Sequence, residues 1–574
     1  MAEDSLVGPL EGPLEGVLAD SVEDTRYARL VLPPDLPPTS GSAVVTEWDR
    51  DRIVRSNALT LLELLQEMSG VTPVRALFFG GPAHALTGAL GPGFLTVRVD
   101  GREATPMDAG QPDLTRFPLA YVQGVRLVRG ATGPVVEITT LARERKQAYS
   151  RIEGGTGDPG LSRLRLVYDN GLGRSFRAAA AAELLDVDAD PSSSDFGFWF
   201  NLEWAPGEGG SGLELVYQTE SMEREVYEAE KLARSELLLR GRLALGSALL
   251  LEAHGGRTTW KPDDPLAEEP ADRSVASGGV ALAGRWDRAW ARVEATAWDG
   301  AAYPAVQAGL EGGVRVLGPL HVDAAGRFGS WDDFGTSEVR GGLGLDLPLG
   351  FALRAQAATG TRGVSYPAFE RADSLGFDAL TGRLDFRGGP FHLYGAAELQ
   401  SLDRQLPFGA SFDRYQQPGG PADVTSLEGG GDLPILPLSW IARGVSPIRV
   451  RGFFRYNSWE SDQSVLYLPQ YLGRGEVGFG DEFFDGNLEV RLGVGVNYRS
   501  SMRTASADAP TTETAETGAV PAYTFLDWNM EIRVMTVLIY FRFDNMSRAA
   551  ASDLPGLAFP VTRSAFGVKW EFLN

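Results

Sequence analysis

Apolar and polar residues alternate one by one along much of the chain after residue 146. From Leu488 to Tyr498 every second residue is a large apolar one, and the residues between them are Glu489, Arg491, Asn497 and two glycines. Successive side chains of a strand point to opposite faces, so this pattern predicts strands with one apolar and one polar face. The same alternation recurs at Phe196–Trp204, Ile448–Tyr456 and Phe566–Phe572.

Such strands fit either a soluble antiparallel sheet or a membrane barrel, and three features favour the barrel. The segments are about 9–11 residues long, enough to cross a bilayer when tilted. Aromatic residues collect near segment ends, as in the interfacial girdles of membrane barrels: Trp260, Trp286, Trp298, Trp331, Tyr456, Tyr498 and Trp570. Tight connections (207–212, 286–289, 348–350, 485–487) also interleave with long polar ones (261–273, 362–374, 404–425, 500–521).

The segments between Ala148 and Leu573 predict an all-β transmembrane barrel of about 22 antiparallel strands, an even number, over residues 147–574. A barrel of this width encloses a lumen that needs a plug. Residues 44–146 are the evident candidate, because they read as a small α+β domain. Residues 1–43, which are acidic and rich in proline, read as a flexible tail.

Local signals predict the elements of this α+β domain. Thr46 and Asp49 have capping-box spacing, which predicts that a first helix begins there. A second helix follows Ser56, with Leu59, Leu62, Leu65 and Met68 on one face and Gly70 as a left-handed stop. Strands are expected at Phe94–Val99, Gly124–Arg129 and Val135–Thr140.

Composition excludes several classes of protein. No run of about 18 apolar residues occurs, which excludes helical membrane spans, and 76 acidic against 53 basic residues argue against nucleic-acid binding. There is no cysteine, and the four histidines have no metal-ligand spacing, so we expect no bound metal and no cofactor. The carboxylates at 263–264 and 268–269 read as solvated surface, or alternatively as a divalent-cation site near lipopolysaccharide. We expect no enzyme activity.

Several motifs, taken in order, resemble those of the TonB-dependent outer-membrane receptors. The plug motifs of that family resemble Val44–Ile53, Leu61–Leu65 with Ser69–Val71, Val97–Arg102, Phe117–Val122 and Val125–Gly130. The last strands of that family resemble Pro521–Asp527, Tyr540–Asn545 and Phe566–Phe572. The resemblance covers the plug and the closing strands, and reaches the middle of the barrel only by its alternating pattern.

This resemblance implies an energised importer of a scarce, bulky nutrient of the siderophore, cobalamin or oligosaccharide type. It implies a location in the Gram-negative outer membrane, with the N-terminus and the short turns in the periplasm. The first residues, 1–5, lack the features of a secretory signal, so the signal is expected to be absent from this chain. The expected partners are outer-membrane lipid and lipopolysaccharide, the inner-membrane TonB complex and other envelope proteins.

The chain departs from the family pattern in two places. After Arg129 and Gly130 the usual loop is missing, since 131–134 runs directly into the next strand, so the plug is trimmed. No clear TonB box is present; the extended apolar stretch 27–32 is the candidate for TonB contact, through Tyr27, Leu30 and Leu32, and it reads equally well as a linker.

The resemblance also indicates residues of interest. Asp100, Gly101, Arg129 and Gly130 carry the plug signature. Arg129 is expected to pair with a carboxylate of the wall, and the candidates for plug–barrel pairing are Glu489, Glu531 and Glu571. Aromatic residues of the outer loops form either a ligand pocket or part of the girdle: Phe334, Tyr366, Phe369, Phe412, Tyr415, Tyr467 and Tyr471.

Three hypotheses for function remain open from the sequence. The first is a TonB-dependent importer. The second is a receptor-like plugged barrel without driven transport, acting as a structural partner in an outer-membrane complex, which the trimmed plug favours. The third is a barrel enzyme, for which the sequence gives little support.

Overall fold

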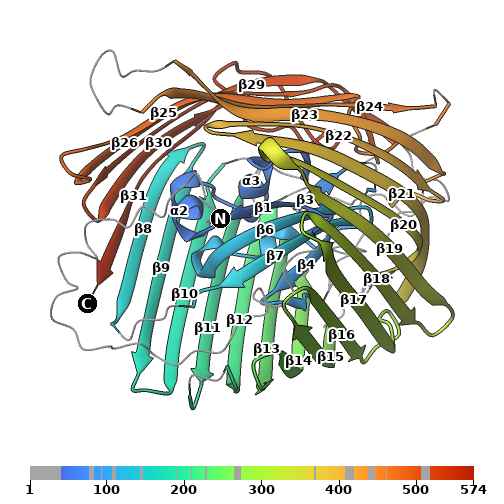
Figure 1. Cartoon of the computed structure of the whole chain (residues 1–574). Coiled ribbons are helices and arrows are strands. Elements are labelled where there is room, and N and C mark those ends of the chain that lie inside the picture. The colour runs from blue at the N-terminus through green and yellow to red at the C-terminus, as the bar shows by residue number, and fades with distance from the viewer. Residues whose placement is uncertain are drawn as a thin grey trace.

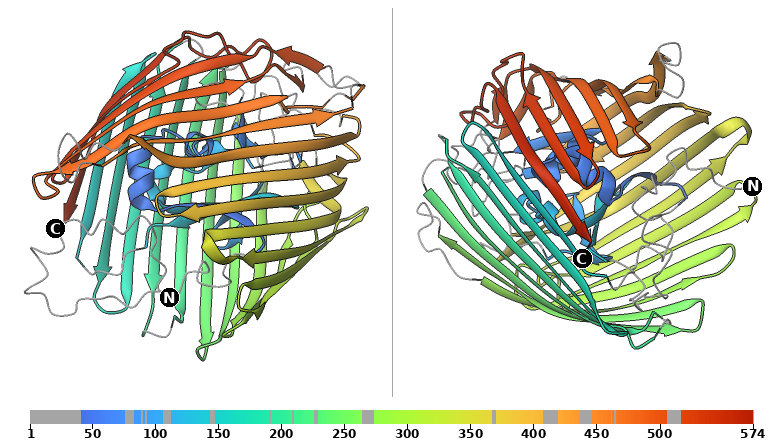
Figure 2. Two further views of the ribbon diagram at one scale, coloured as in Figure 1. Left: turned by 45° about the horizontal axis from the view of Figure 1, so that its top comes forward. Right: turned by 90° about the vertical axis from the view of Figure 1, so that its left-hand side faces the viewer.

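The chain forms a closed β-barrel around a small N-terminal domain (Figures 1 and 2). The computed structural model describes residues 41–75, 83–88, 90–91, 93–105, 112–142, 147–189, 192–207, 210–225, 229–263, 273–366, 370–406, 419–436, 446–460, 462–463, 465–505 and 517–573. The barrel has 22 strands, and each pairs antiparallel with its neighbours. The predicted fold class, a plugged barrel of about 22 strands, is confirmed.

The barrel strands follow one another around the wall in sequence order. Their bounds are β8 Tyr149–Asp158, β9 Leu161–Leu172, β10 Phe176–Val187, β11 Ser193–Trp204, β12 Gly212–Glu225, β13 Ala229–Leu245, β14 Leu249–Asp263, β15 Arg273–Arg285, β16 Ala289–Trp298, β17 Val306–Leu317, β18 Leu320–Ser330, β19 Gly335–Asp346, β20 Phe351–Tyr366, β21 Arg371–Gly388, β22 Phe391–Leu402, β23 Ala422–Leu436, β24 Ile448–Trp459, β25 Tyr471–Phe483, β26 Leu488–Arg499, β29 Tyr523–Val534, β30 Val537–Asp544 and β31 Arg563–Leu573. The wall closes where β31 pairs with β8, which leaves no sheet edge exposed.

The two ends of the barrel differ in their connections. At one end, here called the turn end, most strand pairs are joined tightly, as by residues 173–175, 318–319 and 535–536, although 437–447 is longer. At the other, the loop end, the longest connections are 403–421, 500–522 and 545–562, and the second of these carries a small hairpin, β27 (Met502–Ala505) with β28 (Thr517–Val520). The long loop expected over 362–374 is wrong, because β20 and β21 continue as a paired hairpin from Tyr366 to Arg371.

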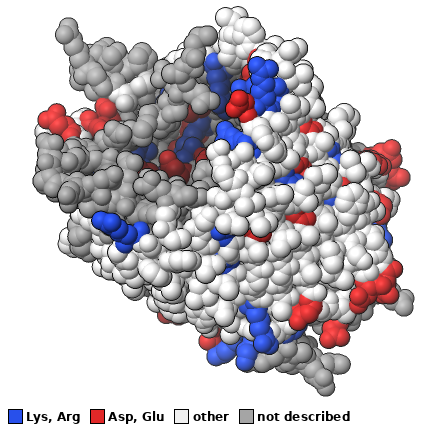
Figure 3. Space-filling view, turned by 60° about the horizontal axis from the view of Figure 1, so that its bottom comes forward, with Lys and Arg blue, Asp and Glu red and all other residues white. Residues whose placement is uncertain are grey.

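The outer surface of the wall is apolar. On β26, Leu492, Val494 and Val496 are 40%, 46% and 42% exposed, whereas Glu489 and Arg499 on the other face are buried. In Figure 3 the wall that faces the viewer is largely white, and charged side chains gather at its margins and in the hollow. Closed pairing of the backbone together with an apolar outer face is the arrangement that a lipid bilayer requires.

Three of the tryptophans expected in an outer girdle, Trp260, Trp298 and Trp331, point into the lumen instead. Trp286, Tyr498 and Trp570 are exposed on the outside, but Trp260 and Trp331 are buried. Trp260 occupies an inward position of β14, where the guanidinium of Arg234 lies 4.5 Å from its ring centroid. The sequence correctly placed Trp260 near the end of a strand, but the prediction that its side chain faces outward is wrong. In the part of the chain that the structure describes, no helix has the length and apolar character to cross a membrane.

The N-terminal domain lies inside the barrel and is called the plug below. Its elements are β1 Val44–Trp48, α2 Arg50–Ser56, α3 Leu61–Gln66, β2 Val71–Arg75, β3 Ala83–Thr87, β4 Thr96–Val99, β5 Arg102–Glu103, the 3₁₀ turns η2 Leu114–Arg116 and η3 Leu119–Tyr121, β6 Val122–Gly130 and β7 Gly133–Thr140. A sheet of order β1-β6-β7-β4-β5 forms its centre, and β2 and β3 form a separate hairpin. The leucines of α3 and the inner face of β6 fill its core.

Both helices begin later than the sequence predicts. Thr46 lies within β1, opposite Leu127 of β6, and Asp49 caps α2 by accepting the N–H of Arg52 at 2.8 Å. Likewise Thr60, not Ser56, caps α3. The backbone around Thr46 pairs with β6, so its hydrogen-bonding groups are not available to a longer helix.

Since every strand pairs with two neighbours, the barrel should resist detergent until it is heated. We expect unboiled and boiled samples to migrate differently on a denaturing gel. Identical mobility, with the protein recovered in the soluble fraction after export, would contradict a membrane barrel.

Candidate functional site

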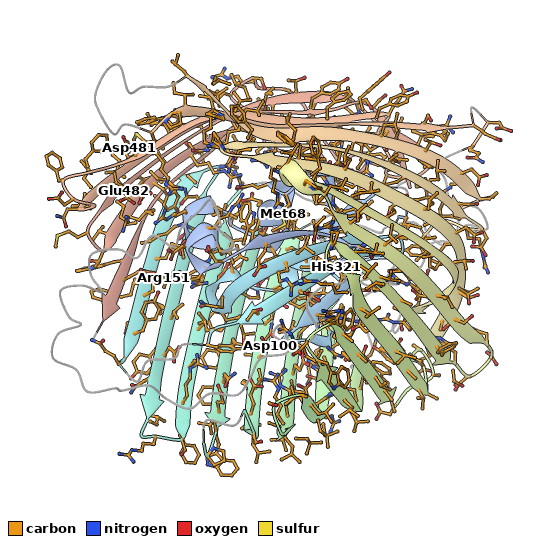
Figure 4. The ribbon with its side chains drawn as sticks, viewed as in Figure 1. Met68, Asp100, Arg151, His321, Asp481 and Glu482 are labelled. Atoms are coloured by element: carbon orange, nitrogen blue, oxygen red, sulfur yellow. The ribbon has the colours of Figure 1, made fainter. Side chains whose placement is uncertain are left out.

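The contact between the plug and the wall is the candidate functional site, because any passage through the lumen depends on it. Figure 4 places Met68 and Asp100 on the plug inside the barrel, and Asp481 and Glu482 at the rim of β25. Around the plug, inward side chains of the wall are mostly charged and buried. The contacts below describe how these charges hold the plug.

Arg129, at the end of β6, makes a buried ion pair with Glu428 of β23. Its Nη1 donates to Glu428 Oε1 and Oε2 at 3.2 and 3.1 Å, and its Nη2 donates to Oε1 at 3.2 Å. Tyr394 donates its hydroxyl to the same carboxylate at 2.9 Å. Burial alone lowers the pKa of Arg129, but Glu428 together with the nearby Tyr394 and Glu398 outweighs burial and raises the pKa above its ordinary value. The expected pairing of Arg129 with a wall carboxylate is therefore present, with a partner that the sequence did not single out.

The three carboxylates named from the sequence have other partners. Glu489 accepts Arg55 of α2 at 3.1 Å, and Glu531 accepts the side-chain amide of Asn57, so both contact the plug. Glu571 accepts the hydroxyl of Tyr149 at 2.8 Å, between neighbouring strands of the wall. The register in which β31 pairs with β8 decides which inward residues of the wall lie level with each element of the plug. That register therefore sets the partners of these carboxylates.

Glu63 connects the plug to the closing strands. Its carboxylate accepts Arg563 at 2.5 Å and Arg542 at 2.9 Å, and it also accepts the N–H of Leu59 at 2.9 Å. Thr60 accepts the N–H of Glu63, so the first turn of α3 fixes the carboxylate in place. Burial alone raises the pKa of Glu63, but the two arginines and the hydrogen bond from Leu59 together outweigh it and hold the pKa far below its ordinary value.

Asp100 and Gly101 form the turn between β4 and β5, both with positive φ of 48° and 80°. This Asp-Gly pair suits a tight hairpin turn. The Asp100 carboxylate accepts the N–H and the hydroxyl of Thr140 at 2.9 and 2.8 Å, which ties the turn to β7. Burial raises the pKa of Asp100.

Arginines of the wall also hold the plug through its backbone, which the sequence analysis did not anticipate. They donate to plug carbonyls that have no partner in the plug's own sheet, and most also pair with a wall carboxylate. The contacts are Arg165 to Leu59 at 2.8 Å, Arg177 to Leu141 at 2.7 Å, Arg240 to Asp100 at 2.8 Å, Arg362 to Phe94 at 2.9 Å, Arg455 to Gly70 at 3.1 Å and Arg474 to Gln66 at 3.0 Å. Arginine at inward strand positions was the available signal, but nothing in the sequence assigns its acceptors.

The aromatic candidates for a ligand pocket do not gather at one place. Phe334 stacks on Trp331 with ring centroids 5.4 Å apart, while Tyr366 and Tyr467 are buried in separate contacts. Tyr471 packs on Tyr456 at 5.4 Å, near the outward Phe454, which favours the girdle interpretation for this residue. Phe369, Phe412 and Tyr415 lie outside the described residues, as do Tyr27, Leu30 and Leu32 of the tail.

Among the residues that the structure describes, no group of three or more histidines, aspartates or glutamates is arranged to hold a metal ion. The polar chemistry of the lumen is that of arginine paired with carboxylates.

No protein-family model matches the chain, and no curated protein matches it significantly in sequence. Solved structures do match it. The siderophore receptor PirA from Acinetobacter baumannii superposes with a TM-score of 0.69 at 11% identity, covering 95% of this chain and 100% of that one. The ferric yersiniabactin uptake receptor FyuA from Yersinia pestis (TM-score 0.69, 12% identity, 93% and 99% coverage) and the FrpB iron transporter from Neisseria meningitidis (TM-score 0.69, 11% identity, 93% and 100% coverage) are similar.

The structural neighbours are siderophore and iron receptors and transporters, and the chain has their fold, a closed 22-strand barrel with an N-terminal plug. The resemblance found in the sequence motifs is thereby confirmed at the level of the fold. These neighbours are receptors and transporters, not enzymes.

Proposed function

We propose that the protein is a TonB-dependent outer-membrane receptor that imports a scarce, bulky nutrient through its plugged barrel. The single observation that carries this proposal is a plug held in the lumen by directional polar contacts, such as Arg129 with Glu428 and Glu63 with Arg563. Such contacts fix the plug at rest and are exchanged for water when it moves. A permanently sealed barrel needs no contacts of this kind.

The place where the plug begins supports an energy input from the turn end. Ser42 accepts a hydrogen bond from Gln356 of β20 at 2.8 Å, and Gly41 lies against His321, next to the turn that joins β17 and β18. The preceding tail therefore joins the plug near the turn end. In the proposed orientation this end faces the periplasm, within reach of an inner-membrane TonB protein, and the loop end faces outward among lipopolysaccharide.

The structural neighbours support a ligand of the siderophore class, since they are a siderophore receptor, a ferric yersiniabactin uptake receptor and an iron transporter. Cobalamin and oligosaccharides are the other classes of bulky nutrient that this proposal includes.

A second candidate function is a receptor-like barrel without driven transport, acting as a structural partner of other envelope proteins. The tight joint between β6 and β7 favours it, because only Ala131 and Thr132 separate these strands, so the plug has a reduced loop there.

The two functions differ in whether the tail binds TonB. An extended peptide pairs edge-on with a partner strand, and Leu30→Pro removes a backbone donor from the 27–32 segment. We expect the variant to bind a purified TonB C-terminal domain at least about tenfold more weakly than the parent in surface plasmon resonance, a loss of about 1.4 kcal/mol. Leu18→Pro, in the same tail outside this segment, is the matched control and should bind as the parent does. Equal binding by the Leu30 variant, or no binding by any version, would favour the structural-partner function.

A further inference from the structure

Gln356 of β20 holds two separate parts of the plug with one side-chain amide. Its Nε2 donates to the hydroxyl oxygen of Ser42 at 2.8 Å, and its Oε1 accepts the N–H of Ala131 at 3.0 Å. Gln356 and Ser42 are each 2% exposed, and Ala131 is buried as well. The amide therefore bridges the residue through which the tail enters the plug and the joint between β6 and β7.

Both parts belong to one corner of the plug sheet. Ser42 comes two residues before Val44, which begins β1 and pairs with Arg129 near the end of β6. Ala131 follows β6 directly and, with Thr132, connects it to β7. The bridge at Gln356 therefore lies at the corner where Arg129 leaves the sheet to meet the wall.

Two glycines of the wall make room for the start of the plug. Gly342 and Gly344 lie on the inner face of β19, where a Cβ would collide with the side chain of Ser42 and with the carbonyl oxygen of Gly41, respectively. At Gly341, on the outer face of the same strand, a Cβ would meet no atom within 4 Å. The inner glycines thus form a seat that keeps Ser42 against Gln356.

A planar amide connects its two partners mechanically. The nitrogen and the oxygen of the Gln356 amide turn together, so movement of Ser42 shifts the oxygen that holds Ala131. The enclosed amide cannot exchange Ser42 for water at its present position, and a buried polar group without a partner is unfavourable. Loss of the contact with Ser42 therefore weakens the contact with Ala131.

We propose that Gln356 couples the tail to the plug, so that a pull on the tail separates Ser42 from Gln356 and frees the joint between β6 and β7. The Arg129 end of β6 is released with that joint. Gln356 is then a positioning residue for the movement of the plug. The proposal rests on the proposed function for the source of the pull, whereas the coupling itself requires only that the tail is displaced.

Hydrogen exchange at the Ala131 amide in the full-length protein measures the coupling, because this N–H donates to Gln356. Ser42→Ala removes the hydroxyl, Gln356→Met replaces the amide with an apolar group of similar length, and a double variant combines both. Gln400→Met is the matched control. Gln400, near the loop end of β22, also accepts a plug N–H, that of Leu90 at 3.1 Å. Heat-modifiable gel mobility checks that each variant is folded.

We expect Ser42→Ala and Gln356→Met each to speed exchange at Ala131 by about tenfold or more. The double variant should exchange no faster than Gln356→Met, because both substitutions break the same bridge. Gln400→Met should stay within a few-fold of the parent. Unchanged exchange in Ser42→Ala, or effects that multiply in the double variant, would overturn the coupling and leave Gln356 as a structural anchor.

The seat is tested by a second route that leaves the amide in place. Gly344→Ala should lift Gly41 and Ser42 from the wall and also speed exchange at Ala131, whereas Gly341→Ala should not. Equal exchange in the two glycine variants would contradict the seat and with it the coupling.

Single-molecule pulling on the N-terminus of the full chain in a bilayer tests the transmission of force. The first extension should need less force in Ser42→Ala and Gln356→Met than in the parent, and the same force in Gln400→Met. Equal force in all four proteins would overturn the proposal. Since no TonB protein is used, failure of the tail to bind TonB would leave these results unchanged and is distinguishable from failure of the coupling.

Discussion

Arg129→Ala is expected to loosen the plug while the barrel stays intact. The substitution leaves the carboxylate of Glu428, whose side chain is 2% exposed, without its bidentate partner. Breaking a buried pair in this way typically costs about 3–5 kcal/mol, which raises the population of the loosened plug by roughly 100-fold or more. Single-channel conductance in a planar bilayer should therefore show larger or more frequent openings than the parent.

A matched control separates the effect of breaking this buried pair from the effect of removing any arginine. Arg449 and Asp432 form a pair at 2.9 Å whose side chains are both 40% exposed, so Arg449→Ala should cost at most about 1 kcal/mol and leave the conductance unchanged. If Arg129→Ala is as silent as the parent while deletion of residues 1–146 opens a large pore, the pair does not hold the plug.

Glu63→Ala is expected to release α3 from the closing strands. The variant removes the carboxylate that Arg563 and Arg542 share on the plug and leaves both arginines with Asp544 of the wall, so a loss of about 3 kcal/mol, the lower end of the range for a broken buried pair, is expected. Hydrogen exchange of the α3 amides in the full-length protein should become faster by roughly 100-fold or more. Glu47→Ala, which removes a carboxylate 67% exposed and 3.7 Å from Arg126, is the control and should leave exchange within a few-fold of the parent.

The Glu63 contact also predicts how acid acts on the plug. The folded-state pKa of Glu63 lies below its unfolded value, so its stabilising contribution is complete above about pH 4.3 and is lost as the pH falls further. The protection factors of the α3 amides, which correct for the intrinsic pH dependence of exchange, should accordingly fall below that pH in the parent and depend less on pH in Glu63→Ala. Equal acid dependence in both proteins would assign the effect to another group.

The predictions for Arg129 and Glu63 concern the same physical feature, a plug fixed by charges rather than by a continuous apolar interface. The wall arginines complete this arrangement, since groups such as Arg455 donate to a plug carbonyl and pair with a wall carboxylate at once. Motion of the plug therefore exchanges protein contacts for contacts with water, which costs less than exposing an apolar core.

On regularly alternating strands such as β26, the face that each side chain presents was determined by the sequence alone. Leu492 and Val494 point outward and Glu489 inward because direction in a strand depends only on odd or even position. The same local rule predicted the strands of the wall. The direction of a side chain within a strand does not depend on which other strand lies nearby.

The partners of the charged residues were decided only by the tertiary structure. Arg129 meets Glu428, 299 positions away, because closure of β31 on β8 and the depth of the plug set which inward residues lie level with β6. Pairing of β1 with β6 likewise moved the start of α2 to Asp49. Alternation fixes the face of a residue within one strand, but distance between strands remote in sequence arises only when the barrel closes around its plug.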